Sequence, residues 1–224
     1  MSTPLVVAID GPSGSGKSST SRGVASRLGL AYLDTGAMYR AITWALLEAG
    51  VDVNDPDAVA QAAEHVVIGS GTDPLKPTIH VGDVDVSEPI RGDAVTAAVS
   101  PVAAVPRVRE LLVGLQRRAI MGATAESTGI VVEGRDIGSV VAPHAQVKIY
   151  LVADPAARAA RRAAEQGVDD TAATEASLVR RDQIDSSRAA SPLTQVEGAT
   201  VVDSTFLTLD EVIETIVGLV ESVR

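Results

Sequence analysis

The sequence predicts an α/β protein in which a parallel sheet is covered by helices on both faces. Two observations carry this prediction. Short apolar runs alternate with helical patterns along most of the 224 residues, as in proteins built from βαβ units. The first run, Leu5–Ile9, leads into Gly11–Ser18, which has the form G-x-x-x-x-G-K-S. A glycine-rich turn between a buried strand and a helix is typical of this fold class.

The turn itself is typical of a phosphate-binding loop. Its glycines allow positive φ angles, so the backbone N–H groups can turn inward and form an anion cradle with the first turn of the next helix. Lys17 is expected to reach the terminal phosphates of a nucleotide, and the Ser18 hydroxyl to help hold Mg²⁺.

The overall composition argues against several classes of function. A formal net charge of −10 and an aromatic content of 2% do not suit a nucleic acid or an acidic membrane as partner. The chain has no cysteine, and its three histidines are scattered without ligand-like spacing, so we expect no metal site built by the protein alone. Because neither a membrane-length apolar run nor a signal-peptide pattern is present, we expect a soluble cytoplasmic protein.

The segment after the loop is expected to fold as helix, strand and helix. Lys17–Leu28 has a helical pattern that ends before a glycine, and Ala31–Leu33 is a short strand candidate. Asp34 or Thr35 can cap the helix that follows. Arg40 lies about one turn into that helix, near its positive end, where a cation gains nothing from the helix dipole. Arg40 is therefore either an anion-binding residue or a solvated surface residue.

A small antiparallel insertion is expected next. Asn54-Asp55-Pro56 begins a helix with proline at its first position, which runs to about His65, and three short strand-like runs follow. The last two runs are separated by Gly82-Asp83, a two-residue hairpin signal. The runs are residues 66–68, 78–81 and 84–86. Helical patterns then resume at 93–104 and again from Pro106.

The second half returns to alternating strands and helices. Ile130–Val132 ends in Glu133-Gly134-Arg135-Asp136, and charged residues just past the carboxyl end of a parallel strand lie where open α/β sheets bind ligands. The remaining predicted elements are a strand at 147–152, a helix opened by Asp154-Pro155, a helix from about Thr174, a strand at 198–202 and a last helix with a Thr208/Glu211 capping box. The order of the strands does not follow from these patterns.

The helix from about Thr174 carries Arg181, Asp185 and Arg188 on one face. One interpretation is a solvated ladder of salt bridges, each worth roughly a few tenths of a kcal/mol. The other is a helical lid, because phosphoryl transfer needs positive charge around three phosphoryl oxygens, and an arginine-bearing hairpin that closes over a nucleotide supplies it and excludes water. The supply of arginine along the chain favours the lid.

Several motifs together resemble those of the bacterial cytidylate kinases, which phosphorylate CMP with ATP. They are Ile9–Lys17, Asp34–Arg40, Pro106–Arg109, Gly134–Asp136 and Arg181–Arg188, and the resemblance covers essentially the whole chain. It implies one domain, residues 1–224, with the P-loop nucleoside monophosphate kinase fold: a parallel sheet flanked by helices, with a small antiparallel insertion and a helical lid. The phosphate loop would span 11–18, the monophosphate-binding region with the insertion about 35–110, and the lid about 155–190.

The resemblance also implies roles for single residues. ATP would be held by Gly11, Pro12, Ser13, Gly14, Ser15, Gly16, Lys17, Ser18 and Ser19, with Mg²⁺ at Ser18. The CMP phosphate or the transferring group would be contacted by Thr35, Arg40, Arg135 and Arg188. Arg181 and Asp185 match lid residues that reach the nucleotide, Asp185 near the ribose. The cytosine side would have Ser100, Arg109 and Glu133, the last where the family commonly has Asp. Lys17, Arg135, Arg181 and Arg188 would be catalytic.

We therefore expect a monomeric, ATP-dependent CMP kinase of pyrimidine nucleotide metabolism that transfers the phosphoryl group in line, accepts dCMP and uses UMP poorly. Another small-molecule P-loop kinase is an alternative of the same class. A GTPase-like switch would need an N-K-x-D signature, whereas the only asparagine, Asn54, is followed by Asp55. A catalytically silent nucleotide-binding module is a third possibility, against which Lys17 and the arginines count.

Overall fold

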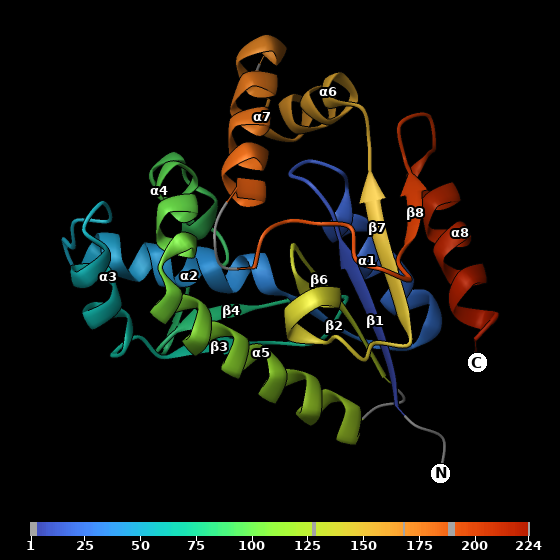
Figure 1. Cartoon of the computed structure of the whole chain (residues 1–224), viewed down its shortest axis with the longest axis horizontal. Coiled ribbons are helices and arrows are strands. Elements are labelled where there is room, and N and C mark those ends of the chain that lie inside the picture. Colours follow the sequence, from blue (N-terminus) through green and yellow to red (C-terminus); the bar gives the residue numbers. More distant parts are fainter. Residues whose placement is uncertain (1–3, 127–128, 168, 188–190, 224) are drawn as a thin grey trace.

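A five-stranded parallel sheet lies at the centre of the protein (Figure 1). The computed structural model describes residues 4–126, 129–167, 169–187 and 191–223, and within them the strand order is β2-β6-β1-β7-β8. Every neighbouring pair in this sheet is parallel, which confirms the predicted fold class. The strands are β1 (Leu5–Asp10), β2 (Ala31–Asp34), β6 (Gly129–Gly134), β7 (Val147–Val152) and β8 (Thr200–Asp203).

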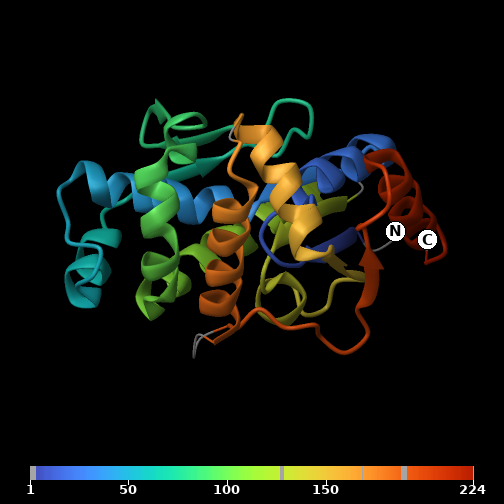
Figure 2. The ribbon, with the colours of Figure 1, turned by 90° about the horizontal axis from the view of Figure 1, so that it is seen from above.

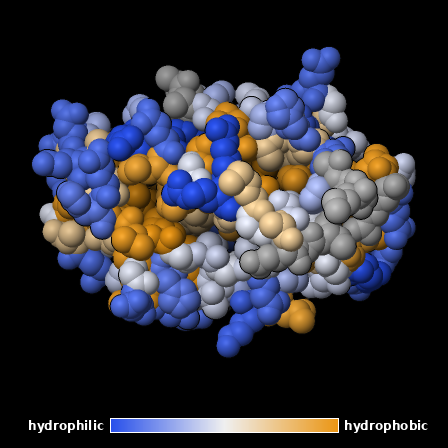
Figure 3. All heavy atoms as spheres, turned by 90° about the horizontal axis from the view of Figure 1, so that it is seen from below, coloured by the Kyte–Doolittle hydropathy of each residue, from blue (hydrophilic) through white to orange (hydrophobic). Residues whose placement is uncertain are grey.

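Helices cover both faces of the sheet. Successive strand residues point to opposite faces of the sheet, and this produces two apolar clusters. Val7 and Ile9 belong to the cluster under the helices α1 and α8, whereas Ala8 belongs to the cluster under α2 and α5. These helices are α1 (Lys17–Leu28), α2 (Thr35–Glu48), α5 (Pro106–Glu126) and α8 (Leu209–Glu221). Exposed large apolar residues such as Met121 and Phe206 are scattered, and Figure 3 shows hydrophobic residues interspersed with hydrophilic ones on one face.

The antiparallel insertion predicted near 66–86 is confirmed. It is the three-stranded sheet of β3 (Ile68–Ser70), β4 (Ile79–Val81) and β5 (Val84–Asp85). From here on, the insertion means this sheet together with the flanking α3 (Pro56–Ala63), the 3₁₀ turn η1 (Pro89–Arg91) and α4 (Asp93–Ala104). The strand β3 starts two residues later than the run at 66–68, because the Val66 N–H still donates to the Ala63 carbonyl at the end of α3. The insertion is joined to the core where Tyr32 N–H donates to the Thr72 carbonyl at 2.8 Å.

Two helices, α6 (Pro155–Gln166) and α7 (Thr171–Ser187), form a hairpin over the carboxyl ends of the sheet strands (Figure 1). From above they lie between the insertion and α8 (Figure 2). The helix α7 begins three residues before the expected Thr174, because the Asp170 carboxylate accepts from the Ala173 N–H at 2.9 Å and caps the helix earlier. We refer to α6 and α7 as the helical hairpin.

Two further features differ from the sequence-based expectation or add to it. The backbone after β6 forms a single π-helical turn, η2 (Ile137–Val141), which no sequence pattern indicated. The strand β8 begins at Thr200 and not at 198, because Gly198 has a φ of 78° and the Ala199 N–H donates back to the Val196 carbonyl in a turn. Among the described residues, none of the helices combines the length and apolarity needed to span a bilayer.

Candidate active site

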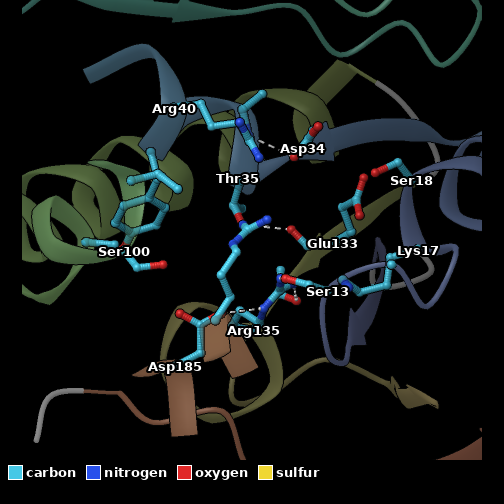
Figure 4. A pocket seen from close by; sticks show the side chains of 18 of the residues that line it. Ser13, Lys17, Ser18, Asp34, Thr35, Arg40, Ser100, Glu133, Arg135 and Asp185 are labelled. Carbon is cyan, nitrogen blue, oxygen red and sulfur yellow. Dashed lines mark hydrogen bonds and ion pairs between the residues drawn. The ribbon is translucent and has the colours of Figure 1, made fainter. Parts of the chain in front are cut away.

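A cavity of about 550 Å³ opens between the carboxyl ends of the core strands, the insertion and the helical hairpin. This volume is ordinary for a small-molecule site, and its position is the one expected for ligands of open α/β sheets. The cavity is lined by the phosphate loop and by side chains of α2, α4, β6, α6 and α7. Figure 4 shows several of these side chains pointing toward the same space.

The phosphate loop takes the form that its glycines allow. Gly11 has a φ of 153°, and a Cβ there would lie 2.1 Å from the Leu151 carbonyl oxygen, so the loop can approach β7 only without a side chain. Gly16, at the start of α1, has a φ of 87°, which is strained for other residues. The loop residues that line the cavity are Ser13, Gly14, Gly16, Lys17, Ser18 and Ser19. Gly11, Pro12 and Ser15, which were also expected to hold ATP, are not among the residues that line the cavity; within the turn the Ser15 hydroxyl donates to the Pro12 carbonyl at 3.1 Å.

Lys17 is held against its own loop. Its Nζ donates to the Pro12 carbonyl at 2.6 Å and to the Ser15 hydroxyl at 3.4 Å. Burial, followed by the positive charge of Arg135, lowers the pKa of Lys17 to about 7. A polyanion next to this ammonium group would oppose both effects and favour its charged form.

Glu133, the carboxylate of β6, faces α1. Its Oε1 accepts from the Tyr32 hydroxyl, and its side chain lies beside that of Ser18 (Figure 4). Burial, then the charge of Asp34, raises the pKa of Glu133 to about 7, while Lys17 lowers it. In Figure 4 Glu133 lies beside Ser18 and Lys17, far from Ser100. Ser100, Arg109 and Glu133, which the sequence grouped together, all line the cavity, but Glu133 lies on its phosphate-loop side.

The carboxylate that accompanies Arg109 is Asp136. The two side chains form an ion pair in which each is about 5% exposed, and both line the cavity together with Ser100. Arg109 also donates to the Ala103 carbonyl at 3.1 Å and lies over the Tyr39 ring, 5.3 Å from its centroid. Within the described residues its Nε has no hydrogen-bond partner. This end of the cavity thus offers an acceptor and a donor that are paired with each other, and the donor is also held by the Ala103 carbonyl and the Tyr39 ring.

Three arginines from three elements meet between these two ends. Arg135 donates to the Ser13 hydroxyl at 2.7 Å and to Asp185 at 3.0 Å. Arg40 is anchored on the Ile90 carbonyl at 3.0 Å, and burial, followed by Arg181, lowers its pKa to about 10.

The pKa of Arg181 is lowered by burial and then by Arg135. In the described part of the chain its Nε makes no hydrogen bond. Guanidinium groups that disfavour each other's charge are suited to an anion of high charge.

Most of the residues expected from sequence meet at this cavity: Thr35, Arg40, Ser100, Arg109, Glu133, Arg135, Arg181 and Asp185. Thr35 donates to the Glu133 carbonyl at 2.7 Å. Arg188, the remaining candidate, lies outside the described residues.

Sequence reasoning missed several contributors. Asp136 belongs to the Gly134–Asp136 motif but received no role, and Asp34, Arg22, Arg91 and Arg162 also line the cavity. Tyr32 and Asp182 act on site residues only through tertiary contacts, for which the sequence holds no local signal. Among the described residues there is no group of three or more His, Asp or Glu arranged to hold a metal ion.

Two comparisons with known proteins point to one family, and a third concerns the fold. A family model described as cytidylate kinase matches residues 7–222. A cytidylate kinase of Streptomyces griseus subsp. griseus is 56% identical over 98% of this chain and 94% of its own length, and one of Mycobacterium avium is 50% identical over 98% and 96%. The crystal structure of an uncharacterized protein from Eubacterium ventriosum superposes with a TM-score of 0.51 at 12% identity, over 98% and 99% of the two chains. The last comparison supports only the fold.

Proposed function

Since the chain belongs to the cytidylate kinase family, we propose that it transfers the γ-phosphoryl group of ATP to the phosphate of CMP, and also of dCMP. The observation that carries the proposal is the composition of one cavity. A phosphate loop lies at one end, the Arg109–Asp136 pair with Ser100 at the other, and Arg40, Arg135 and Arg181 between them. Donor phosphates, acceptor base and transferring group each have a matching set of side chains.

The donor side is the phosphate loop, Gly11–Ser19. Its backbone N–H groups and the N-terminus of α1 would bind the ATP phosphates. Lys17 would leave the Pro12 carbonyl for the transferring phosphate, and the phosphate charge would keep its ammonium group protonated. The loop can contribute little proton chemistry, and none is needed, because phosphoryl transfer depends on alignment and charge neutralisation.

The acceptor phosphate would lie among the arginines. Arg40 and Arg181 reach it from α2 and α7, Arg135 from the end of β6, and Thr35 adds a hydroxyl. We also include Arg188 of the same chain segment in this set, as the family resemblance implies. Neighbouring arginines lower the pKa values of Arg40 and Arg181, so the transferring group, which carries charge on three oxygens, would be stabilised strongly.

The cytosine would be recognised by Arg109 and Asp136. An ionised carboxylate can only accept hydrogen bonds and a guanidinium can only donate them. Cytosine offers a donor at its amino group and acceptors at N3 and O2, so it matches this pair, whereas uracil reverses the pattern at C4 and N3. We assign the base-reading carboxylate to Asp136 in place of Glu133, because Asp136 is the one paired with Arg109.

Glu133 would then serve the metal side. Its carboxylate and the Ser18 hydroxyl are hard oxygen ligands next to the loop, and Mg²⁺ in such enzymes is held by one or two protein oxygens, phosphate oxygens and water. The chain's residues therefore fit the ion. When bound, Mg²⁺ would neutralise charge on the ATP phosphates.

Product analysis tests this proposal directly. The protein is incubated with ATP, Mg²⁺ and CMP, and the nucleotides are separated by anion-exchange chromatography. The proposal requires ADP and CDP in equal amounts and no ADP without CMP. ADP that forms in the absence of CMP would indicate a nucleotide hydrolase or switch. Nucleotide binding without turnover would indicate a catalytically silent module.

A further inference from the structure

A buried carboxylate that the proposed function does not use lies directly behind the phosphate loop. Asp10 is the last residue of β1 and is only 5% exposed. It does not line the cavity. Its Oδ1 accepts from the Ile137 N–H and its Oδ2 from the Gly138 N–H, both at 2.8 Å. One side chain is thus bonded to two successive amides 127 and 128 positions further along the chain.

These two amides open the π-helical turn η2. The residue before it, Asp136, makes no capping bond to the turn, because its side chain is paired with Arg109. Asp10 from the neighbouring strand supplies the missing acceptors. The packing is close on this side too: a Cβ on Gly138 would lie 3.4 Å from Asp10 Oδ2 and 3.3 Å from Val196. The backbone at 137–138 therefore has little freedom to move relative to β1.

The fixed turn directly follows two residues of the site. Arg135 contacts the phosphate loop at Ser13, and Asp136 holds Arg109. Any shift of the 137–138 backbone would displace both side chains. We propose that Asp10 is a positioning residue, whose carboxylate sets the Arg135–Asp136 segment relative to the phosphate loop and so aligns the base-binding end of the cavity with the phosphate-binding end. This inference rests on the proposed function.

The role needs both oxygens as acceptors, and so the ionised form. The titratable groups that interact electrostatically with Asp10 are Asp136, Lys17 and Tyr150. Burial raises the pKa of Asp10 to about 6, although its two backbone hydrogen bonds and Lys17 lower it. At pH 8 the carboxylate is ionised. An asparagine in this place can accept only at its oxygen, and its NH₂ group would face an N–H donor.

The test is Asp10→Asn, assayed at pH 8 with ATP and CMP varied separately. We expect the KM for CMP to rise by about tenfold or more, the cost of leaving one buried donor unpaired, while the KM for ATP stays within about twofold. The matched control is Asp55→Asn, the same change in a carboxylate that also accepts from two successive amides, Asp57 and Ala58. There both bonds go to one oxygen, Oδ1, at the exposed start of α3, and the asparagine oxygen can keep them. This control should leave both KM values unchanged.

A second measurement is independent of turnover. Amide hydrogen exchange in Asp10→Asn should be faster at 137–141 than in wild type, with α1 unchanged. This holds even if the substrate is not CMP, so a failure of the proposed function is distinguishable from a failure of this inference. If Asp10→Asn does not fold, Gly138→Ala is the second variant. Its added Cβ would crowd Val196 and the Asp10 carboxylate and displace the 137–138 backbone, so the KM for CMP should rise by at least about threefold.

An unchanged KM for CMP in the folded variant, or equal increases in both KM values, would overturn the positioning role. Unchanged exchange at 137–141 would do the same.

Discussion

The Asp182 carboxylate in α7 accepts a hydrogen bond of 2.9 Å from the backbone N–H of Ser13 in the phosphate loop. Its other oxygen pairs with Arg158 of α6, which also donates to the Ser13 carbonyl at 2.9 Å. Both backbone polar groups of one loop residue are therefore bonded to the helical hairpin. Arg158 is 5% exposed, so the loss of its partner would leave a buried charge uncompensated. This contact ties the position of the hairpin to that of the loop.

We predict that Asp182→Ala loosens the hairpin without unfolding the core. Amide exchange in α6 and α7 should become faster, and kcat/KM for CMP should fall by about tenfold or more, since Arg158 loses its charge partner and the Ser13 amide its acceptor. The control is Glu214→Ala, which removes a carboxylate from an exposed ion pair with Arg27. It should change neither the amide exchange of the hairpin nor kcat/KM for CMP. Wild-type exchange rates in α6 and α7 of the Asp182 variant would contradict the coupling.

Lys17→Ala should abolish kinase activity and leave the fold intact. Among the described residues, the Lys17 side chain makes hydrogen bonds only within its own loop. In the reaction it would neutralise the transferring phosphate, so we expect a loss of at least about a thousandfold in kcat, or about 4 kcal/mol at about 1.4 per tenfold. Circular dichroism and steady-state kinetics on the same preparation check both parts. A folded variant with wild-type turnover would remove Lys17 from the mechanism.

Substitutions at Asp136 and Glu133 should affect different properties of the enzyme, namely base selection at Asp136 and Mg²⁺ dependence at Glu133. Asp136→Asn should narrow the ratio of kcat/KM for CMP and UMP by about tenfold or more, because an amide can donate as well as accept and no longer rejects the uracil carbonyl.

Glu133→Gln serves as its matched control. It should leave that ratio unchanged and raise the Mg²⁺ concentration needed for half-maximal rate. If Glu133→Gln alone changes the ratio, the assignment of the two carboxylates is reversed.

The stability of the protein should depend on pH through Asp10. Burial raises its pKa from the ordinary 3.8 to about 6. The unfolded chain thus releases this proton near pH 4 and the folded chain near pH 6, so this group destabilises the fold as pH rises through that window.

Asparagine does not titrate, which isolates the effect. The unfolding free energy of wild type minus that of Asp10→Asn should fall by roughly 1–2 kcal/mol from pH 5 to pH 7.5, at about 1.4 per pH unit. Urea unfolding at both pH values measures it, and a difference that is constant or grows with pH is the contrary result.

Local patterns predicted most of the fold. Alternating apolar runs, the Gly82-Asp83 hairpin and the Thr208 capping box all specify structure within a few residues, and the structure contains each of them. Boundaries shifted where a side chain or turn further along decided them, as with the Asp170 cap of α7. Strand order depends on packing between distant segments, for which a single sequence gives no signal.

The site was predictable to the same degree. The phosphate loop is local, and Ser13, Gly14 and Gly16–Ser19 of it line the cavity, whereas Gly11, Pro12 and Ser15 do not. The sequence grouped Glu133 with Ser100 and Arg109, whereas in the structure it lies beside Lys17 and Ser18. Strand alternation gives a clue to this position, because Glu133 has the parity of Val131, which packs under α1. Asp10, Tyr32 and Asp182 act through hydrogen bonds across more than 100 residues, which no spacing reveals.

The central claim is that this cavity phosphorylates CMP by reading its base with Arg109 and Asp136. A coupled ADP-release assay with CMP, dCMP, UMP, AMP and GMP as acceptors tests it most directly. Because uracil would leave buried donors and acceptors unpaired, we predict that kcat/KM for CMP exceeds that for UMP by at least about a hundredfold, with dCMP used and the purine nucleotides inactive. Equal use of CMP and UMP, or preference for any other acceptor, would contradict the account.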